Sequence, residues 1–350
     1  APAGPAAHAL LRGAAGGGQP VPGPFPDVEC KVIPIPKVRN GGFVCSPKPA
    51  AGQMFPLHVF GHGDNSLPEV YQKLLENVAS YGFVVVGYRS CLKSVSGYLI
   101  TACQGGAGAF LEVLKVIDAF ARHPALSADA PVDMSRQVTV SGHSTGGRAA
   151  LMVGAVKDNP SYLSGTWMWM YSWQLNRNCR ALRRAAARVG AVVALHPDLM
   201  TNPWFNPDVA RFYGAISRTP VFLDVTVGDV VLDDGGVWTD FLMTRPPYKI
   251  YANFEEEGVD GGHMAPAQLA LEGPWVARFG QAFALEDASA RQLLYGECGQ
   301  CFRHAMSFGR EGQRNSRNGA PGLLLCGEDA NGAPFAYPSA KATFCNATQR

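Results

Sequence analysis

The chain has 350 residues, of which 47% are hydrophobic and 17% are charged, and its formal net charge is +2 at pH 7. This composition suffices for a large core, and the length fits either one large domain with extensions or two domains. The small net charge excludes the basic field that favours a nucleic-acid partner, and no apolar run approaches the length needed for stable membrane insertion.

Strands and helices are predicted to alternate along most of the chain. Residues 1–28 are rich in Ala, Gly and Pro and form a predicted disordered leader or the remnant of a targeting segment. The predicted strands are 29–36, 42–46, 56–60, 83–88, the run from Gln137, 190–195, 220–227 and about 248–254. The predicted helices begin with a cap at Ser66, span 109–123, follow Ser144, and start again at Pro266 and Pro274. This alternation predicts an α/β domain over 29–295, with a mostly parallel central sheet and helices on both faces.

Two segments depart from this pattern. The first is an insertion at about 159–188, which contains a run rich in Trp and Met and then a basic helical run at 180–188. The second is the polar extension 296–350, which contains four cysteines and is expected to be held by disulfides.

Nine cysteines are many for a cytosolic enzyme. They favour disulfides in an oxidising compartment, secreted or organellar, with one thiol left over. A glycosylation sequon at Asn346 agrees with secretion. Cys298 and Cys301 have the spacing of a redox or zinc half-site, but they lack a second pair and a preceding thioredoxin-like strand. We predict no metal.

Gly142-His143-Ser144-Thr145-Gly146 lies between a β-branched run and a helix-like segment. This is the setting of a nucleophile elbow, in which a serine at the apex of a tight turn is flanked by residues without a Cβ. The alternative is a Gly-rich turn whose serine caps the helix. We predict that Ser144 is the catalytic nucleophile.

A serine nucleophile needs a histidine base and a carboxylate, in the chain order Ser, Asp or Glu, His. His263 is favoured as the base because it lies in a glycine-containing loop after the last strand and before a helix. His196 follows a strand at the same edge but precedes the acids after Pro220. It is interpreted as a hydrogen-bonded rim residue or a substrate contact.

Asp229 directly follows a predicted strand and is favoured as the acid over Asp224, Asp233 and Asp234. Oxyanion donors are expected from backbone N–H groups. Thr145, the residue after the nucleophile, supplies one, and Asp64 in the early loop supplies the other, with its side chain turned away.

These motifs resemble the α/β-hydrolase superfamily, and within it the dienelactone-hydrolase-related esterases. That group includes chlorophyllases, cutinase-type polyester hydrolases and platelet-activating-factor acetylhydrolases. The resemblance rests on His62-Gly63, on 78–86, and on 132–136 before the 142–147 motif. It implies the triad Ser144, Asp229 and His263, oxyanion donors at Asp64 and Thr145, and no cofactor. Polyester hydrolases carry an aromatic residue where the strand after the nucleophile helix ends, and this chain has Leu195-His196-Pro197 there.

The predicted function is hydrolysis of a lipophilic carboxylic ester, chlorophyllase-like or polyester-hydrolase-like, by a monomer through an acyl-enzyme. An acyltransferase or peptidase on the same triad, or a catalytically silent binding protein, are the alternatives. The predicted substrate contacts are His143, His196, Trp167, Trp169 and Trp204. The Trp-rich run is interpreted either as a lid or pocket wall or as ordinary packing.

Overall fold

The computed structural model describes most of the predicted α/β domain. The described residues are 22–89, 92–95, 98–101, 109–161, 172–198, 213–226, 229, 231, 237, 240–241, 243–254, 262–268, 270, 272–295, 326–328 and 334–336. Trp167, Trp169 and Trp204, together with most of the predicted extension, lie outside them. None of the described helices is long and apolar enough to cross a membrane.

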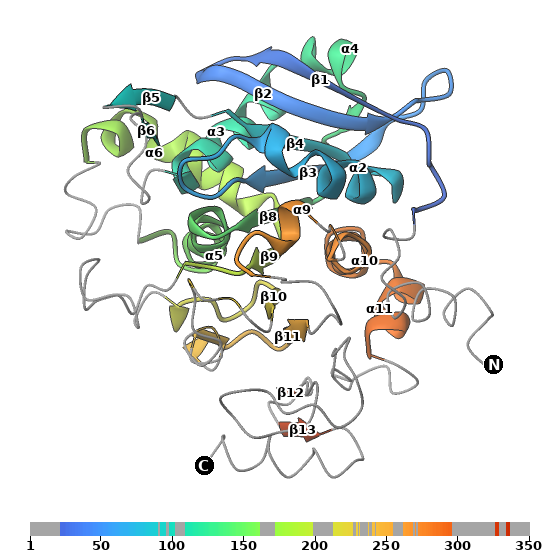
Figure 1. The fold of residues 1–350 in the computed structure, drawn as a ribbon, viewed down its shortest axis with the longest axis vertical. Helices are drawn as coiled ribbons and strands as arrows, with labels where there is room; N and C mark the ends of the chain where they lie inside the picture. Colours follow the sequence, from blue (N-terminus) through green and yellow to red (C-terminus); the bar gives the residue numbers. More distant parts are fainter. Residues whose placement is uncertain are drawn as a thin grey trace.

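A mixed sheet forms the centre of the domain (Figure 1). Its strands are β1 (Val28–Ile35), β2 (Val38–Pro47), β3 (Phe55–Gly61), β4 (Val84–Tyr88), β8 (Val138–His143), β9 (Val189–Leu195), β10 (Val221–Thr226) and β11 (Lys249–Phe254). They run in the order β1-β2-β4-β3-β8-β9-β10-β11, and the short β7 (Val132–Asp133) pairs with β3. The β1–β2 and β2–β4 pairs are antiparallel, and every pair from β4 to β11 is parallel. The prediction of a mostly parallel sheet is confirmed.

Helices cover both faces of the sheet (Figure 1). On one face, α3 (Ala109–Arg122), α5 (Thr145–Asp158) and α6 (Ser172–Ala187) contribute to one apolar core. On the other, α2 (Gln72–Ser80), α9 (Ala265–Gln268), α10 (Gly273–Ala284) and α11 (Ala288–Tyr295) contribute to a second core. Because both faces are covered, the central parallel strands are buried, and β8, β9 and β10 are buried at every position.

The antiparallel β1–β2 hairpin forms one edge of the sheet. Cys30 and Cys45 face each other in its register and are joined by a disulfide. Phe25, which precedes the predicted boundary at 29, packs on Phe55 with ring centroids 5.3 Å apart.

The start of the first helix differs from the prediction. The chain enters it through a 3-10 turn, η2 (Pro68–Tyr71), and neither η2 nor α2 has a side-chain cap. Ser66 Oγ instead donates to the carbonyl of Leu67, at 3.4 Å. The predicted cap at Ser66 is therefore wrong, because the 3-10 turn places the helix start beyond the reach of this hydroxyl.

Several short elements were not predicted. They are α4 (Leu126–Asp129), β7, the hairpin of β5 (Leu92–Val95) and β6 (Tyr98–Thr101), and the pair of β12 (Cys326–Glu328) and β13 (Pro334–Ala336). Within the predicted insertion, α6 forms a helix whose Leu182, Ala185 and Ala186 are buried. This part of the insertion therefore packs against the domain.

Candidate active site

Ser144 lies at the sharp turn between β8 and α5. Its backbone is in the left-handed region, at φ 55 and ψ −122, which a non-glycine residue adopts at a cost of about 1–3 kcal/mol. A Cβ on Gly146 would approach the carbonyl oxygen of Gly61 to 2.1 Å, and one on Gly142 would approach the oxygen of Gly146 to 2.2 Å. The two glycines of the motif are thus required by close backbone packing.

The turn is held from three sides. The Ser144 N–H donates to the Leu195 carbonyl at 3.0 Å, and the Ser144 carbonyl accepts from the N–H groups of Arg148 and Asp198, each at 3.0 Å. The Arg148 guanidinium, which is 3% exposed, pairs with the Asp198 carboxylate at 2.8 Å. These contacts hold the backbone of the turn in its strained conformation.

Asp229 and His263 meet at the carboxyl edge of the sheet. Asp229 follows β10, and His263 lies in the turn that precedes α9. His263 Nδ1 donates to Asp229 Oδ2 at 2.9 Å, and the Val231 N–H donates to Asp229 Oδ1 at 2.8 Å. The Asp229 side chain is 1% exposed and that of His263 is 15% exposed. The other ring nitrogen of His263, Nε2, is therefore available to act as a base.

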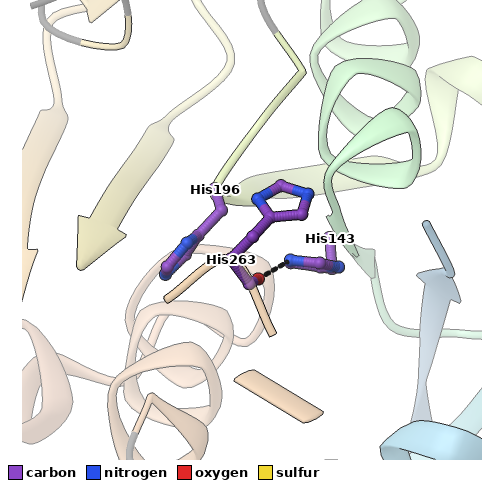
Figure 2. Close-up of side chains that lie close together, drawn as sticks. All are labelled: His143, His196 and His263. Carbon is purple, nitrogen blue, oxygen red and sulfur yellow. Dashed lines mark hydrogen bonds between the residues drawn. The ribbon is translucent and has the colours of Figure 1, made fainter. Parts of the chain in front are cut away.

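His143, the residue beside Ser144, is in contact with His263. His143 Nε2 donates to the His263 carbonyl at 2.6 Å, and the two rings are 4.7 Å apart between centroids (Figure 2). Within the described residues, no hydrogen bond joins the Ser144 hydroxyl to His263. Catalytic hydrogen bonds are often long without substrate and tighten when it binds.

A hydrogen-bonded chain runs from the early loop to His263, the predicted base. The Gly63 N–H donates to the Tyr71 hydroxyl at 3.3 Å, and this hydroxyl donates to His143 Nδ1 at 2.7 Å. Because the His263 carbonyl can only accept, His143 carries its proton on Nε2, and its Nδ1 accepts. Burial, aided by the neighbouring His196 and His263, holds the pKa of His143 well below 6.5. His143 is 1% exposed, which does not favour the expected substrate contact.

His196 lies directly after β9 and is fully buried. Its Nδ1 donates to Asp229 Oδ2 at 2.9 Å, and its Nε2 accepts from the Thr226 hydroxyl at 2.7 Å. Burial lowers the pKa of His196 below 6.5, against the opposing influence of Asp229. Of the two sequence interpretations, this geometry agrees with a hydrogen-bonded residue and does not favour a substrate contact.

The two expected oxyanion donors are Thr145 and Asp64, and Gly63, which precedes Asp64, lies next to Ser144: a Cβ on Gly63 would come to 3.3 Å from Ser144 Cβ. Thr145 is the first residue of α5, and an N–H at this position has no carbonyl partner within its own helix. Asp64 is exposed and follows Gly63, whose own N–H is engaged by Tyr71. The Tyr71 contact thus holds the loop that presents Asp64.

Three histidines at this edge raise the question of a metal ion. His143, His196 and His263 present ring nitrogens within 4.8 Å of one another. Both ring nitrogens of His143 and both of His196 already have protein partners, so ligation would break those hydrogen bonds. The cluster therefore fits the handling of protons better than the binding of a metal.

Sequence reasoning missed three side chains of the site: Tyr71, Thr226 and Asp198. Thr226 ends β10, so its place at the carboxyl edge was a usable signal. Tyr71 and Asp198 carried none, because their roles depend on contacts with residues far away in the chain.

Residues 30–164 match the family model described as Chlorophyllase. The matched segment contains the hairpin, the early loop and the nucleophile turn, and it ends before His196, Asp229 and His263. No curated protein matches the chain. Together with the mixed sheet, the match shows an α/β-hydrolase-like chain, and it indicates a hydrolase that acts on esters.

Proposed function

We propose that this chain, which resembles chlorophyllases over residues 30–164, is a serine carboxylic-ester hydrolase with the triad Ser144, His263 and Asp229. The observation that carries the proposal is the hydrogen bond of His263 Nδ1 to the buried Asp229, beside a serine held in a strained turn. The hydrogen bond fixes the tautomer in which His263 Nε2 accepts a proton.

The acylation step follows from these positions. Ser144 Oγ bonds to the ester carbonyl carbon while His263 Nε2 takes its proton, and the carbonyl π electrons move to oxygen. The N–H groups of Thr145 and Asp64 stabilise this oxyanion. The intermediate collapses, the alkoxide leaves with the proton from Nε2, and the acyl group remains on Ser144. Asp229 stays anionic and stabilises the imidazolium.

Deacylation repeats these steps with water as the nucleophile. His263 Nε2 takes a proton as the water oxygen bonds to the acyl carbon, and the second oxyanion occupies the same donors. Collapse breaks the bond to Ser144 Oγ, which recovers the proton from Nε2, and the carboxylic acid is released. All protons are thus returned, and the cycle consumes one ester and one water.

The proposed substrate is a lipophilic ester. Two exposed apolar side chains adjoin site residues in the sequence: Val231, 63% exposed, lies two residues after Asp229, and Val70, 51% exposed, precedes Tyr71. Exposed apolar groups beside a reactive centre favour apolar ligands. The Cys30–Cys45 disulfide supports an oxidising compartment, secreted or organellar.

The test compares p-nitrophenyl ester hydrolysis by the wild type, Ser144→Ala and Ser135→Ala. Ser135 is a matched control because its hydroxyl binds Asp133 in an exposed turn. We expect turnover by the wild type and Ser135→Ala, and background rates from Ser144→Ala. An inactive wild type would favour the silent binding protein, and equal rates for Ser144→Ala would remove Ser144 from the mechanism.

A substrate panel then separates the finer possibilities. Esters of increasing chain length, a chlorophyll and an aromatic polyester are offered to the active protein. We expect kcat/KM to rise with the apolar surface of the ester. Higher rates with a peptide, or transfer to an added alcohol in preference to water, would favour the peptidase or the acyltransferase.

A further inference from the structure

The proposed acid accepts two imidazole hydrogen bonds on one oxygen. Asp229 Oδ2 lies 2.9 Å from His263 Nδ1 and 2.9 Å from His196 Nδ1. We propose that His196 is a positioning residue that acts through Asp229, orienting the carboxylate and moderating its pull on the His263 imidazole. This inference rests on the proposed triad and adds to it a fourth residue.

The backbone of His196 is held in a strained conformation that serves this contact. Its φ is 40, in the left-handed region, which costs about 1–3 kcal/mol for a non-glycine residue. The His196 N–H donates to both the carbonyl oxygen and Oδ1 of Asp224, each at 3.0 Å. Strain of this kind persists only where the surroundings enforce it, and here it turns the ring from the end of β9 toward Asp229.

The ring of His196 is held in one tautomer. The carboxylate of Asp229 can only accept, so Nδ1 carries the proton, and the Thr226 hydroxyl then donates to Nε2. Thr226 and Asp229 come from the same strand end, since the Asp229 N–H donates to the Thr226 carbonyl at 3.1 Å. His196 therefore joins the exit of β9 to the exit of β10 through both ring nitrogens.

Burial lowers the pKa of this ring and keeps it neutral, although the Asp229 carboxylate acts in the opposite direction. Asp229 accepts the hydrogen bond from His196 Nδ1, and Asp224 accepts one from the His196 backbone N–H. The ring centroids of His143 and His263 lie 5.7 and 6.1 Å from that of His196. Glu272 lies behind Asp224, and burial together with this neighbour raises the pKa of Asp224 well above its ordinary value. On the other side of the site, Asp198 is the further acid that interacts with His263. Figure 2 shows the three rings gathered at one point.

A neutral second donor has a definite consequence for the base. Each N–H that a carboxylate accepts stabilises its negative charge, so the oxygen attracts the proton of the other donor less strongly. With His196 in place, the imidazolium of His263 is stabilised less than it would be by the same carboxylate without the His196 donor. Removal of the His196 donor should therefore let the base protonate at higher pH.

The first test compares the pH dependence of kcat/KM in the wild type, His196→Leu and His196→Asn. Asparagine retains an N–H close to the position of Nδ1, and leucine retains none. We expect the acid limb to move upward by about one pH unit in His196→Leu, with a lower kcat, and to stay near the wild-type position in His196→Asn. Identical acid limbs in the wild type and His196→Leu would overturn the proposal.

His58→Leu is the matched control. His58 is also fully buried, and its Nε2 contacts a hydroxyl, that of Ser141, at 2.5 Å. His58 lies within β3 and pairs in register with Thr139 of β8, away from Asp229. We expect lower stability and an unmoved acid limb; an equal shift in this control would mean that loss of any buried imidazole produces the effect.

A second test needs neither activity nor a folded His196→Leu variant. In wild type labelled with ¹⁵N-histidine, two strongly deshielded Nδ1–H protons are expected, and both should move upfield in Asp229→Asn. If only one of the two protons shifted, Asp229 would not be the acceptor of both, and the proposal would be overturned. If the wild type hydrolyses no ester but both protons shift, the proposed function fails while the hydrogen-bonded pair remains, so the two failures are distinguishable.

Discussion

Removal of the Tyr71 hydroxyl tests whether the early loop and the base are coupled. In Tyr71→Phe the ring can keep its contact with Phe60, where the centroids are 4.9 Å apart, so little packing is lost. The variant leaves His143 Nδ1 without its donor and the Gly63 N–H without its acceptor. Burial raises the pKa of Tyr71 to about 12, so the hydroxyl is protonated, and acts as a donor, at every working pH.

Each buried polar group left without a partner costs about 1–3 kcal/mol, so with two such groups we expect the free energy of unfolding to fall by about 2–6 kcal/mol. The loop that carries Asp64 also loses a restraint, and kcat should fall about tenfold or more, since loss of one oxyanion donor costs about 100-fold or more. Urea unfolding and kcat on a p-nitrophenyl ester measure the two effects.

Tyr88→Phe is the control for this variant, because the Tyr88 hydroxyl has no hydrogen bond to any residue that the structure describes. It should change both quantities little. If Tyr71→Phe matched the control in stability and in kcat, the hydrogen-bonded chain from Gly63 to His143 would have no energetic role, and the reasoning would be refuted.

Three further perturbations test buried charge and the hairpin. Burial raises the pKa of Asp240 to about 8, so the folded protein keeps a proton that the unfolded chain releases. The stability due to this group should therefore fall as the pH rises from about 4 to 8. In urea titrations, the free energy of unfolding should fall by about 1–3 kcal/mol less between pH 5 and 7 in Asp240→Asn than in the wild type. Burial lowers the pKa of His58 to about 3, so the unfolded chain takes up a proton below pH 6.5 that the folded protein does not. The drop in the free energy of unfolding from pH 7.5 to 5.5 should therefore be about 1.4 kcal/mol smaller in His58→Leu than in the wild type. An equal drop in the two proteins would contradict the lowered pKa of His58. The Cys30–Cys45 disulfide spans a sequence separation of 15, so its reduction should lower the free energy of unfolding by about 3 kcal/mol. Dithiothreitol should therefore lower the Tm of the wild type but not that of Cys30→Ser, which lacks this disulfide.

The sequence was most informative where a local pattern determined the structure. The strand run before Ser144, the two close-packed glycines and the helix after it are all local, and the nucleophile turn forms as the pattern predicts. The parallel sheet then brings the ends of β10 and β11 to the same edge, which explains why Asp229 and His263 could be chosen from their positions after strands.

The sequence was least informative where a role depends on distant contacts. His196 shares the acceptor Asp229, which is 33 residues away, and His143 contacts the carbonyl of His263, which is 120 residues away. Both were predicted to touch substrate, because position after a strand or beside the nucleophile does not indicate burial. The cap predicted at Ser66 failed for a local reason, since a 3-10 turn and an α-helix start with similar residues.

The most direct test of the proposed function is covalent labelling of the nucleophile. A serine-directed p-nitrophenyl phosphonate is incubated with the wild type and with His263→Ala, and the adduct is followed by intact mass and located by peptide mass spectrometry. The account predicts rapid formation of a single adduct on the peptide that contains Ser144, and almost no labelling of His263→Ala. Equal labelling rates for the two proteins, or an adduct on another residue, would contradict it.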